Sequence, residues 1–102
     1  MKQVFDDYAQ RLREVVLDRD WDDVYKLARS IGLAWSNNQQ IFLCGNGGSA
    51  ANAVHLANDF LYGVGYGQVP GIRVEALSAN TAVLTCLAND IDYSEIFSQQ
   101  LK

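Results

Sequence analysis

The first third of the chain alternates apolar and polar positions with the period of an α-helix. Residues 2–18 carry apolar side chains about one turn apart, among them Val4 and Tyr8, which predicts an amphipathic helix. A second helical pattern begins after Asp20, whose carboxylate suits an N-cap position. We therefore expect residues 1–38 to form a helical hairpin.

Shorter apolar runs follow this helical part. Residues 41–44 form a continuous apolar run, which is typical of a strand buried on both faces of a parallel sheet. Residues 72–77 have the pattern of a second strand. Between them we expect a helix over residues 50–62, capped by Ser49, and a loop over residues 63–71 that is rich in glycine. A strand–helix–strand order predicts a right-handed parallel crossover.

Two more helices are expected after the second strand. Residues 81–88 form a short apolar helix, and Asp92 and Glu95 have the spacing of a capping box that opens a last helix reaching Lys102. A sheet of only two strands is marginal, and the order of elements calls for a third strand. We therefore expect the first half of an α/β domain, completed by further chain or by an oligomeric partner.

Composition narrows the class of protein. The 102 residues are 49% hydrophobic, which is enough for the core of one domain. Twelve acidic and eight basic residues, with no basic cluster, argue against a nucleic-acid partner. Neither a membrane span nor a signal peptide is expected. Cys44 and Cys86 each lie in an apolar run, so we expect buried thiols and a reducing, cytoplasmic compartment.

The segment Gly-Asn-Gly-Gly-Ser at residues 45–49 is the first candidate site. Glycines let backbone N–H groups approach an anion, and the N-terminus of the next helix adds unpaired donors and a positive dipole end. Ser49 adds a hydroxyl group. The alternative is an ordinary turn between strand and helix, without a ligand. We expect this segment to bind a phosphorylated small molecule.

Other phosphate-binding motifs fit this segment less well. No lysine follows the glycines, which excludes a P-loop. Gly45, Gly47 and Ala50 match a relaxed dinucleotide-binding pattern. That pattern also needs an acidic residue about 20 positions further on, at the end of the second strand. Glu75 comes later and lies within the strand, so a dinucleotide is the weaker alternative.

The helix after the glycines carries His55, the only histidine, and Asp59 four residues later. At this spacing both side chains leave one face of the helix, where they would supply two zinc ligands or a base with its orienting partner. The alternative is a solvated surface pair. Asn89 and Asp90 either end the short apolar helix or face the ligand. Further polar residues follow the second strand: Ser78, Asn80 and Thr81.

Residues 44–60 (CGNGGSAANAVHLANDF) resemble the phosphosugar-binding segment of SIS (sugar isomerase) domains, in particular the phosphoheptose isomerase branch. Residues 84–90 and 93–97 resemble the second block of that branch. The resemblance implies a flavodoxin-like, three-layer α/β sandwich with a parallel sheet, assembled as a homo-tetramer. Residues 1–38 would then be its N-terminal helical hairpin, and residues 39–102 the first half of the SIS domain.

The resemblance also implies an activity and residue roles. The reaction would be the aldose–ketose interconversion of sedoheptulose 7-phosphate and D-glycero-D-manno-heptose 7-phosphate, on the route to lipopolysaccharide heptose. His55 and Asp59 would be catalytic and would bind zinc, with Asp59 at a position where the family has glutamate, which is longer by one methylene. Substrate contacts would come from six residues: Asn46, Gly47, Gly48, Ser49, Asn89 and Asp90.

Other parts of the family's site fall outside these residues. Its second serine-rich phosphate loop and its later glutamine and histidine would lie beyond Lys102. We therefore expect half of a site here, and no isomerase activity from the 102 residues alone. The aspartate at the glutamate position leaves open an alternative. In it the chain is a non-catalytic SIS module that binds a phosphosugar or a protein such as a replication initiator.

Overall fold

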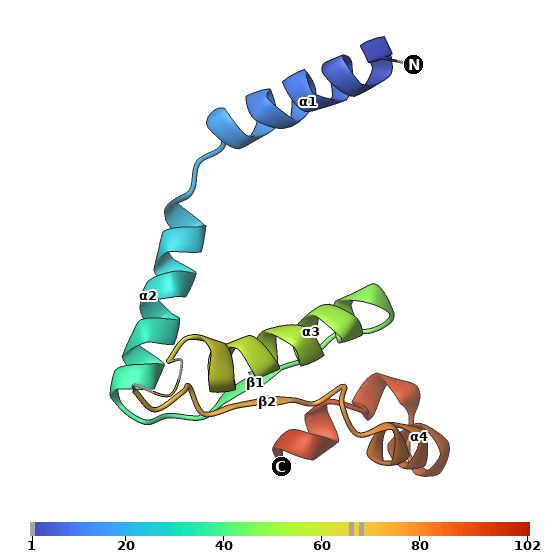
Figure 1. The fold of residues 1–102 in the computed structure, drawn as a ribbon. Coiled ribbons are helices and arrows are strands. Elements are labelled where there is room, and N and C mark those ends of the chain that lie inside the picture. The colour runs from blue at the N-terminus through green and yellow to red at the C-terminus, as the bar shows by residue number, and fades with distance from the viewer. Residues whose placement is uncertain (1, 66, 68) are drawn as a thin grey trace. The chain divides into compact units, whose positions relative to one another are not determined.

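Figure 1 shows the computed structural model, which describes residues 2–65, 67 and 69–102. The chain divides into two compact units, Met1–Ser30 and Ile31–Lys102. Tyr66 and Gln68 of the predicted glycine-rich loop, and Met1 of the predicted hairpin, lie outside the described residues.

The first two helices form where the apolar pattern placed them. α1 spans Lys2–Leu17 and α2 spans Asp22–Ser36, which confirms both predicted helices. Asp20 starts the second helix, because its Oδ1 accepts a hydrogen bond from the backbone N–H of Asp22 at 2.9 Å. Neither helix buries a residue among those described. The pairing of the helices into a hairpin, and a domain boundary after residue 38, stay predictions.

The second unit is built around two parallel strands, β1 (Ile41–Leu43) and β2 (Val74–Ala76). The register pairs Leu43 with Ala76. α3 (Gly48–Asn58) connects the strands and packs against both. The parallel pairing and the strand–helix–strand order are therefore confirmed, although both strands are shorter than predicted.

The prediction that the first strand is buried on both faces is wrong for the described residues. Phe42, the middle residue of β1, is 45% exposed, and its two neighbours in the strand are only half-buried. A parallel strand becomes buried on both faces only where helices cover both sides of the sheet. In the described part of the chain, α3 is the helix that contacts both strands.

The helix after the glycines begins earlier than predicted. Gly47, and not Ser49, occupies the N-cap position of α3, with φ +55° and no side-chain cap. Glycine adopts this left-handed conformation without steric cost, which places Ser49 inside the first turn. At its other end α3 continues without a break into a π-helical turn over Asp59–Gly63, so the predicted extent of the helix is otherwise confirmed.

α4 spans Thr81–Asp90 and is longer than the predicted helix. Asn80 caps it, because Asn80 Oδ1 accepts a hydrogen bond from the N–H of Val83 at 3.2 Å. Asn89 and Asp90 lie in its last turn, so the interpretation of these two residues as a turn after the helix is wrong. Their own side chains stay off the backbone and bond to each other, which leaves the helical ladder intact.

The C-terminal α-helix that the capping box predicted does not form. Two 3₁₀ turns, Tyr93–Glu95 and Ser98–Leu101, take its place. Asp92 does accept from the N–H of Ser94 at 2.8 Å. The carboxylate of Glu95, however, binds the hydroxyl of Ser98 instead of reaching back to the start of the turn. The reciprocal half of the capping box is therefore missing.

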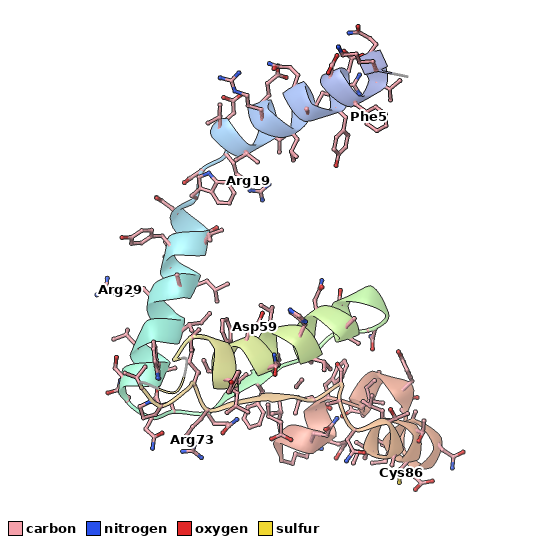
Figure 2. The ribbon with its side chains drawn as sticks, viewed as in Figure 1. Phe5, Arg19, Arg29, Asp59, Arg73 and Cys86 are labelled. Carbon is pink, nitrogen blue, oxygen red and sulfur yellow. The ribbon has the colours of Figure 1, made fainter. Side chains whose placement is uncertain are left out.

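A small core holds the second unit together. Its buried apolar residues are Ala53, Ile72, Ala76, Leu77 and Ile96. Cys44 and Cys86 are both free and exposed, so the prediction of buried thiols is wrong. Cys44 follows the end of β1, and Cys86 lies on α4, where it bonds to an aspartate (Figure 2). Among the described helices, none is long and apolar enough to span a bilayer.

Candidate functional site

The glycine loop, which we define as residues 45–49, turns the chain from β1 into α3. The N–H of Ser49 donates to the carbonyl of Asn46 at 3.0 Å, and the N–H of Ala50 donates to the carbonyl of Gly47 at 3.1 Å. These bonds close the loop into the first turn of the helix. The loop is therefore a folded turn with a definite backbone path.

Three amides of the glycine loop have no hydrogen-bond partner among the described residues. In the part of the chain that the structure describes, no hydrogen bond uses the backbone N–H of Asn46, Gly47 or Gly48. All three residues are exposed. They stand at the N-terminus of an 11-residue helix, where the dipole adds partial positive charge. An anion with several oxygens, such as a phosphate group, matches this arrangement.

Gly45 opens the loop under tight steric constraint. A Cβ atom on this residue would lie 2.6 Å from the backbone carbon and oxygen of Ser49. The chain therefore folds back on itself so closely that only glycine fits. The hydroxyl of Ser78 also meets Gly45, accepting from its N–H at 3.1 Å and donating to its carbonyl at 2.7 Å. The sequence places Ser78 among the polar residues that follow the second strand, and it gives no sign of this backbone contact.

His55 and Asp59 come together as their spacing predicts. His55 Nε2 lies 3.4 Å from Asp59 Oδ2, and the side chains are 78% and 49% exposed. Both atoms are donors of the kind that zinc binds, and both are accessible to solvent. Within residues 2–65, 67 and 69–102, no further cysteine or carboxylate side chain lies close enough to make a third metal ligand with this pair. The pair would thus supply two ligands, fewer than the three that a catalytic zinc site takes from its protein.

Asn89 and Asp90 form a second polar cluster on α4, together with Cys86. The side-chain amide of Asn89 donates to Asp90 Oδ1 at 2.8 Å, and the thiol of Cys86 donates to Asp90 Oδ2 at 3.2 Å. The amide of Asn89 first, and then the thiol, lower the pKa of Asp90 below its ordinary value. The hydrogen bond to Asp90 and the charge of this carboxylate raise the pKa of Cys86.

The structure does not join this second cluster to the glycine loop. No hydrogen bond among the described residues links Asn89 or Asp90 to residues 45–49. α4 leaves the carboxyl end of β2 at Thr81, and Asp90 is its last residue. At 1.5 Å per residue, that end of the helix is about 13 Å away from its start.

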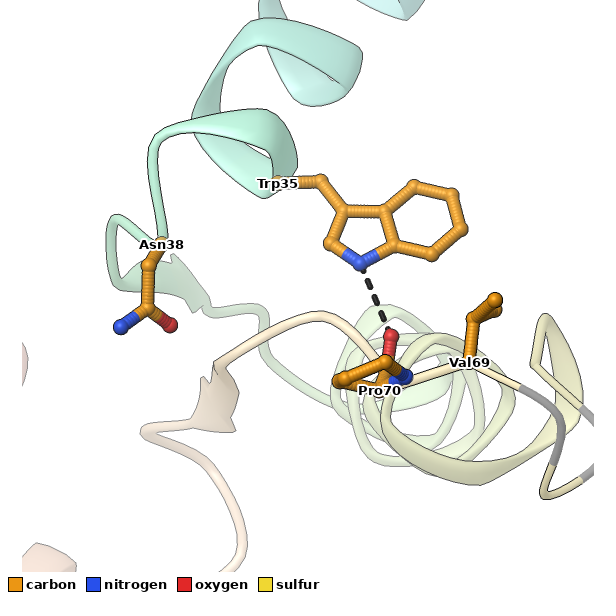
Figure 3. Close-up of a pocket in the computed structure, with 5 residues that line it drawn as sticks. Trp35, Asn38, Val69 and Pro70 are labelled. Atoms are coloured by element: carbon orange, nitrogen blue, oxygen red, sulfur yellow. Dashed lines mark hydrogen bonds between the residues drawn. The ribbon is translucent and has the colours of Figure 1, made fainter.

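A hollow of about 480 Å³ lies elsewhere in the second unit (Figure 3). It is lined by Trp35, Asn38, Val69, Pro70 and Gly71. The indole N–H of Trp35 donates to the carbonyl of Pro70 at 2.9 Å. Asn38 precedes β1 and Gly71 precedes β2, so the hollow is at the amino ends of the strands. Ligands of open α/β sheets bind at the carboxyl ends, where the glycine loop lies.

Comparison with curated proteins finds relatives by sequence. The phosphoheptose isomerase of Chlorobaculum parvum is 41% identical over 94 residues, covering 90% of this chain and 44% of that protein. The phosphoheptose isomerase of Halorhodospira halophila is 35% identical over 100 residues, covering 98% of this chain and 50% of that protein. The chain thus spans about half the length of the curated relatives that it matches.

A solved structure shows the same architecture. The phosphoheptose isomerase GmhA from Neisseria gonorrhoeae matches with a TM-score of 0.73 and 28% identity, over 98% of this chain and 52% of that chain. This match confirms the predicted α/β class of fold. A family model described as "SIS domain" covers residues 4–102. The chain therefore belongs to the SIS domain family.

Proposed function

We propose that the glycine loop binds the phosphate group of a sugar phosphate, as part of a phosphoheptose isomerase. The observation that carries this proposal is the group of three exposed amides at the start of α3, for which the described part of the chain offers no hydrogen-bond partner. The substrate would be sedoheptulose 7-phosphate, interconverted with D-glycero-D-manno-heptose 7-phosphate. The names of the relatives support this choice.

Phosphate binding would take place at the N-terminal turn of α3. The amides of Asn46, Gly47 and Gly48 would donate to phosphate oxygens, and the hydroxyl of Ser49 would add a fourth donor. The phosphate is remote from the carbons that react. Its binding therefore fixes the sugar in place, so that part of the entropic cost of the reaction is met before chemistry begins. Asn89 and Asp90 would contact the sugar in the complete site.

Proton transfer would depend on the pair on α3. In the ketose-to-aldose direction the carboxylate of Asp59 takes a proton from C1, which gives an enediolate, the anion of the cis-enediol, with its negative charge on O2. The same carboxylate returns the proton to C2, while a hydroxyl proton moves from O1 to O2. His55, 3.4 Å from Asp59, orients this carboxylate. Asp59 is 49% exposed and is therefore open to substrate.

Zinc is part of the proposal. His55 and Asp59 would hold the ion through the imidazole nitrogen and a carboxylate oxygen, and the remaining ligands would come from the rest of the complete site. When bound, zinc would polarise the substrate carbonyl. The aspartate at the family's glutamate position favours one alternative, a module that binds the sugar phosphate without turnover.

Assembly and location complete the proposal. The residues on the apolar side of α1 are exposed: Val4, Phe5, Tyr8, Leu12 and Val15. An apolar helix face gains stability when another surface covers it, and the proposed cover is a further copy of the chain in a homo-tetramer. The proposed compartment is the cytoplasm, where the two free cysteines would remain reduced.

Substitution of Asp59 tests the proposed reaction. In a protein that carries the complete site, we expect Asp59→Asn to bind sedoheptulose 7-phosphate with the affinity of the unchanged protein, while kcat falls by about 10²-fold or more. Asn89→Asp serves as the comparison, because it alters the sugar contacts and leaves the base in place. Turnover that persists in Asp59→Asn would show that Asp59 is not the base. Binding without turnover in an unchanged protein that carries the complete site would favour the non-catalytic module.

A further inference from the structure

Ser78 faces Gly45 across the end of the sheet. The strands pair Leu43 with Ala76, and the backbone ladder continues with the N–H of Leu77 bonded to the carbonyl of Leu43 at 2.8 Å. Extending the same register by two residues places Ser78 opposite Gly45. At this point the side-chain hydroxyl of Ser78, instead of a backbone group, makes the hydrogen bonds to the opposite residue.

This single hydroxyl satisfies both backbone polar groups of Gly45. It accepts from the N–H of Gly45 at 3.1 Å and donates to the carbonyl of Gly45 at 2.7 Å. The contact is half-buried and joins residues 33 positions apart in the chain. A partly buried bond of this kind competes less with water than the exposed bonds of serine side chains elsewhere in the structure. It therefore ties the start of the glycine loop to the end of β2.

The contact between Ser78 and Gly45, which we call the tether, constrains the residues that follow Gly45. Gly45 packs so closely on Ser49 that a Cβ atom would lie 2.6 Å from its backbone. The path from Gly45 to Ser49 is thus fixed at both ends, and the three free amides lie between them. Glycine-rich segments lose much conformational entropy when they become ordered. A tether that orders the loop before a ligand arrives therefore reduces the cost of binding.

The other polar residues after β2 have different partners. Asn80 accepts from the N–H of Val83 and caps α4. Asp92 accepts from Ser94 in the turn that follows α4. Among the hydrogen bonds of the described residues, those of Ser78 are the side-chain bonds that reach the glycine loop from β2. The arrangement singles out Ser78 as the residue that holds the loop.

We propose that Ser78 is a positioning residue: through Gly45 it holds the amides of Asn46, Gly47 and Gly48 ready for a phosphate group. Ser78 itself does not touch the ligand. The identity of the ligand rests on the proposed function, whereas the tether between Ser78 and Gly45 does not. The two claims are therefore tested separately, with inorganic phosphate as the probe for binding and sedoheptulose 7-phosphate for turnover.

The test compares three variants: amide exchange and phosphate binding are measured on the 102 residues, and kinetics on a protein that carries the complete site. Ser78→Ala removes the hydroxyl and Ser78→Thr retains it. Ser98→Ala is the matched control, because the hydroxyl of Ser98 bonds to Glu95 in the last turns and, within the described residues, not to the glycine loop. Residue-resolved amide exchange reports the tether directly. We expect the amide of Gly45 to exchange at least about fivefold faster in Ser78→Ala, as for the loss of one hydrogen bond. Ser78→Thr and Ser98→Ala should exchange as the unchanged protein does.

Binding and kinetics show whether the tether serves the site. Ser78→Ala should raise the Kd for inorganic phosphate, and the KM for the sugar phosphate, by about fivefold or more. Its kcat should stay within about twofold. The substitution weakens binding of the substrate and of the transition state equally, and the base is unchanged. Ser78→Thr should restore both values. If Ser78→Ala does not fold, Ser78→Cys, which keeps the shape with a weak donor, takes its place.

Each outcome decides between the claims. Equal exchange of Gly45 in Ser78→Ala and Ser98→Ala would overturn the inference, whatever the ligand is. Faster exchange with unchanged phosphate affinity would also overturn it, because the tether would then not serve binding. If exchange is faster but the unchanged protein does not bind phosphate, the tether is supported and the proposed function fails.

Discussion

His55 Nε2 lies 3.4 Å from Asp59 Oδ2, one helical turn apart, at the junction of α3 and the π-helical turn that extends it. Figure 2 shows Asp59 on this helix. π-helical turns within α-helices are frequent at functional sites. The imidazole and the carboxylate therefore meet at a local irregularity of the helix.

Metal content tests the role of this pair. If His55 and Asp59 bind zinc, a protein that carries the complete site should contain zinc in stoichiometric amount when it is purified without chelators. His55→Ala should lose most of it, because one of the few ligands is gone. Asp92→Asn is the matched control, since it alters an exposed carboxylate that bonds to Ser94. Equal zinc content by elemental analysis in His55→Ala and Asp92→Asn would contradict the proposal.

The close approach within the glycine loop predicts that alanine substitutions at two of its glycines differ in their effect on stability. Gly45→Ala should destabilise the protein by about 1–3 kcal/mol, because its Cβ would overlap the backbone of Ser49. Gly48→Ala should be tolerated, because nothing lies within 4 Å of its Cβ position, and alanine favours a helix. Urea denaturation measures both. Equal stability of the two variants would show that the loop does not fold back as described.

The raised pKa of Cys86 predicts slow alkylation. The thiolate is the reactive form, so a pKa above the ordinary value means that iodoacetamide reacts with Cys86 only at higher pH. In a Cys44→Ser background, the midpoint of the rate against pH should lie above that of an ordinary cysteine, about 8.5. Asp90→Ala should lower the midpoint, because both main causes of the shift come from Asp90.

Asn89→Ala is the control for this measurement. It removes the bond to the other oxygen of Asp90 and leaves the thiol bond in place. The midpoint for Cys86 should therefore stay high. A midpoint that falls equally in Asn89→Ala and Asp90→Ala would contradict the assignment of the shift to the Cys86–Asp90 contact.

The sequence predicted those parts of the fold that depend on local pattern. Apolar periodicity placed α1, α2 and α3, and a short apolar run between polar residues located β1. The spacing of His55 and Asp59 predicted their contact, because four residues along a helix bring side chains together.

The predictions from the sequence were wrong where the packing around a residue, and not the local sequence pattern, determines its conformation or burial. Ser49 is a good cap by residue type, but Gly47 adopts the left-handed conformation and takes that position. Cys44 and Cys86 look buried by their neighbours, yet burial depends on which elements cover them. The contact of Ser78 with Gly45 joins distant residues. Nothing in either local sequence indicates it before the register of the strands is known.

Amide chemical shifts offer the most direct test of phosphate binding at the glycine loop. Sedoheptulose 7-phosphate and inorganic phosphate should both shift the amide resonances of Asn46, Gly47 and Gly48, whereas sedoheptulose without its phosphate should not. The largest changes should fall on these three residues. The amides of Trp35 and of Gly71, which follows Pro70, lie at the opposite end of the strands and should not shift. Binding of the sugar phosphate with these three amides unmoved would contradict the account.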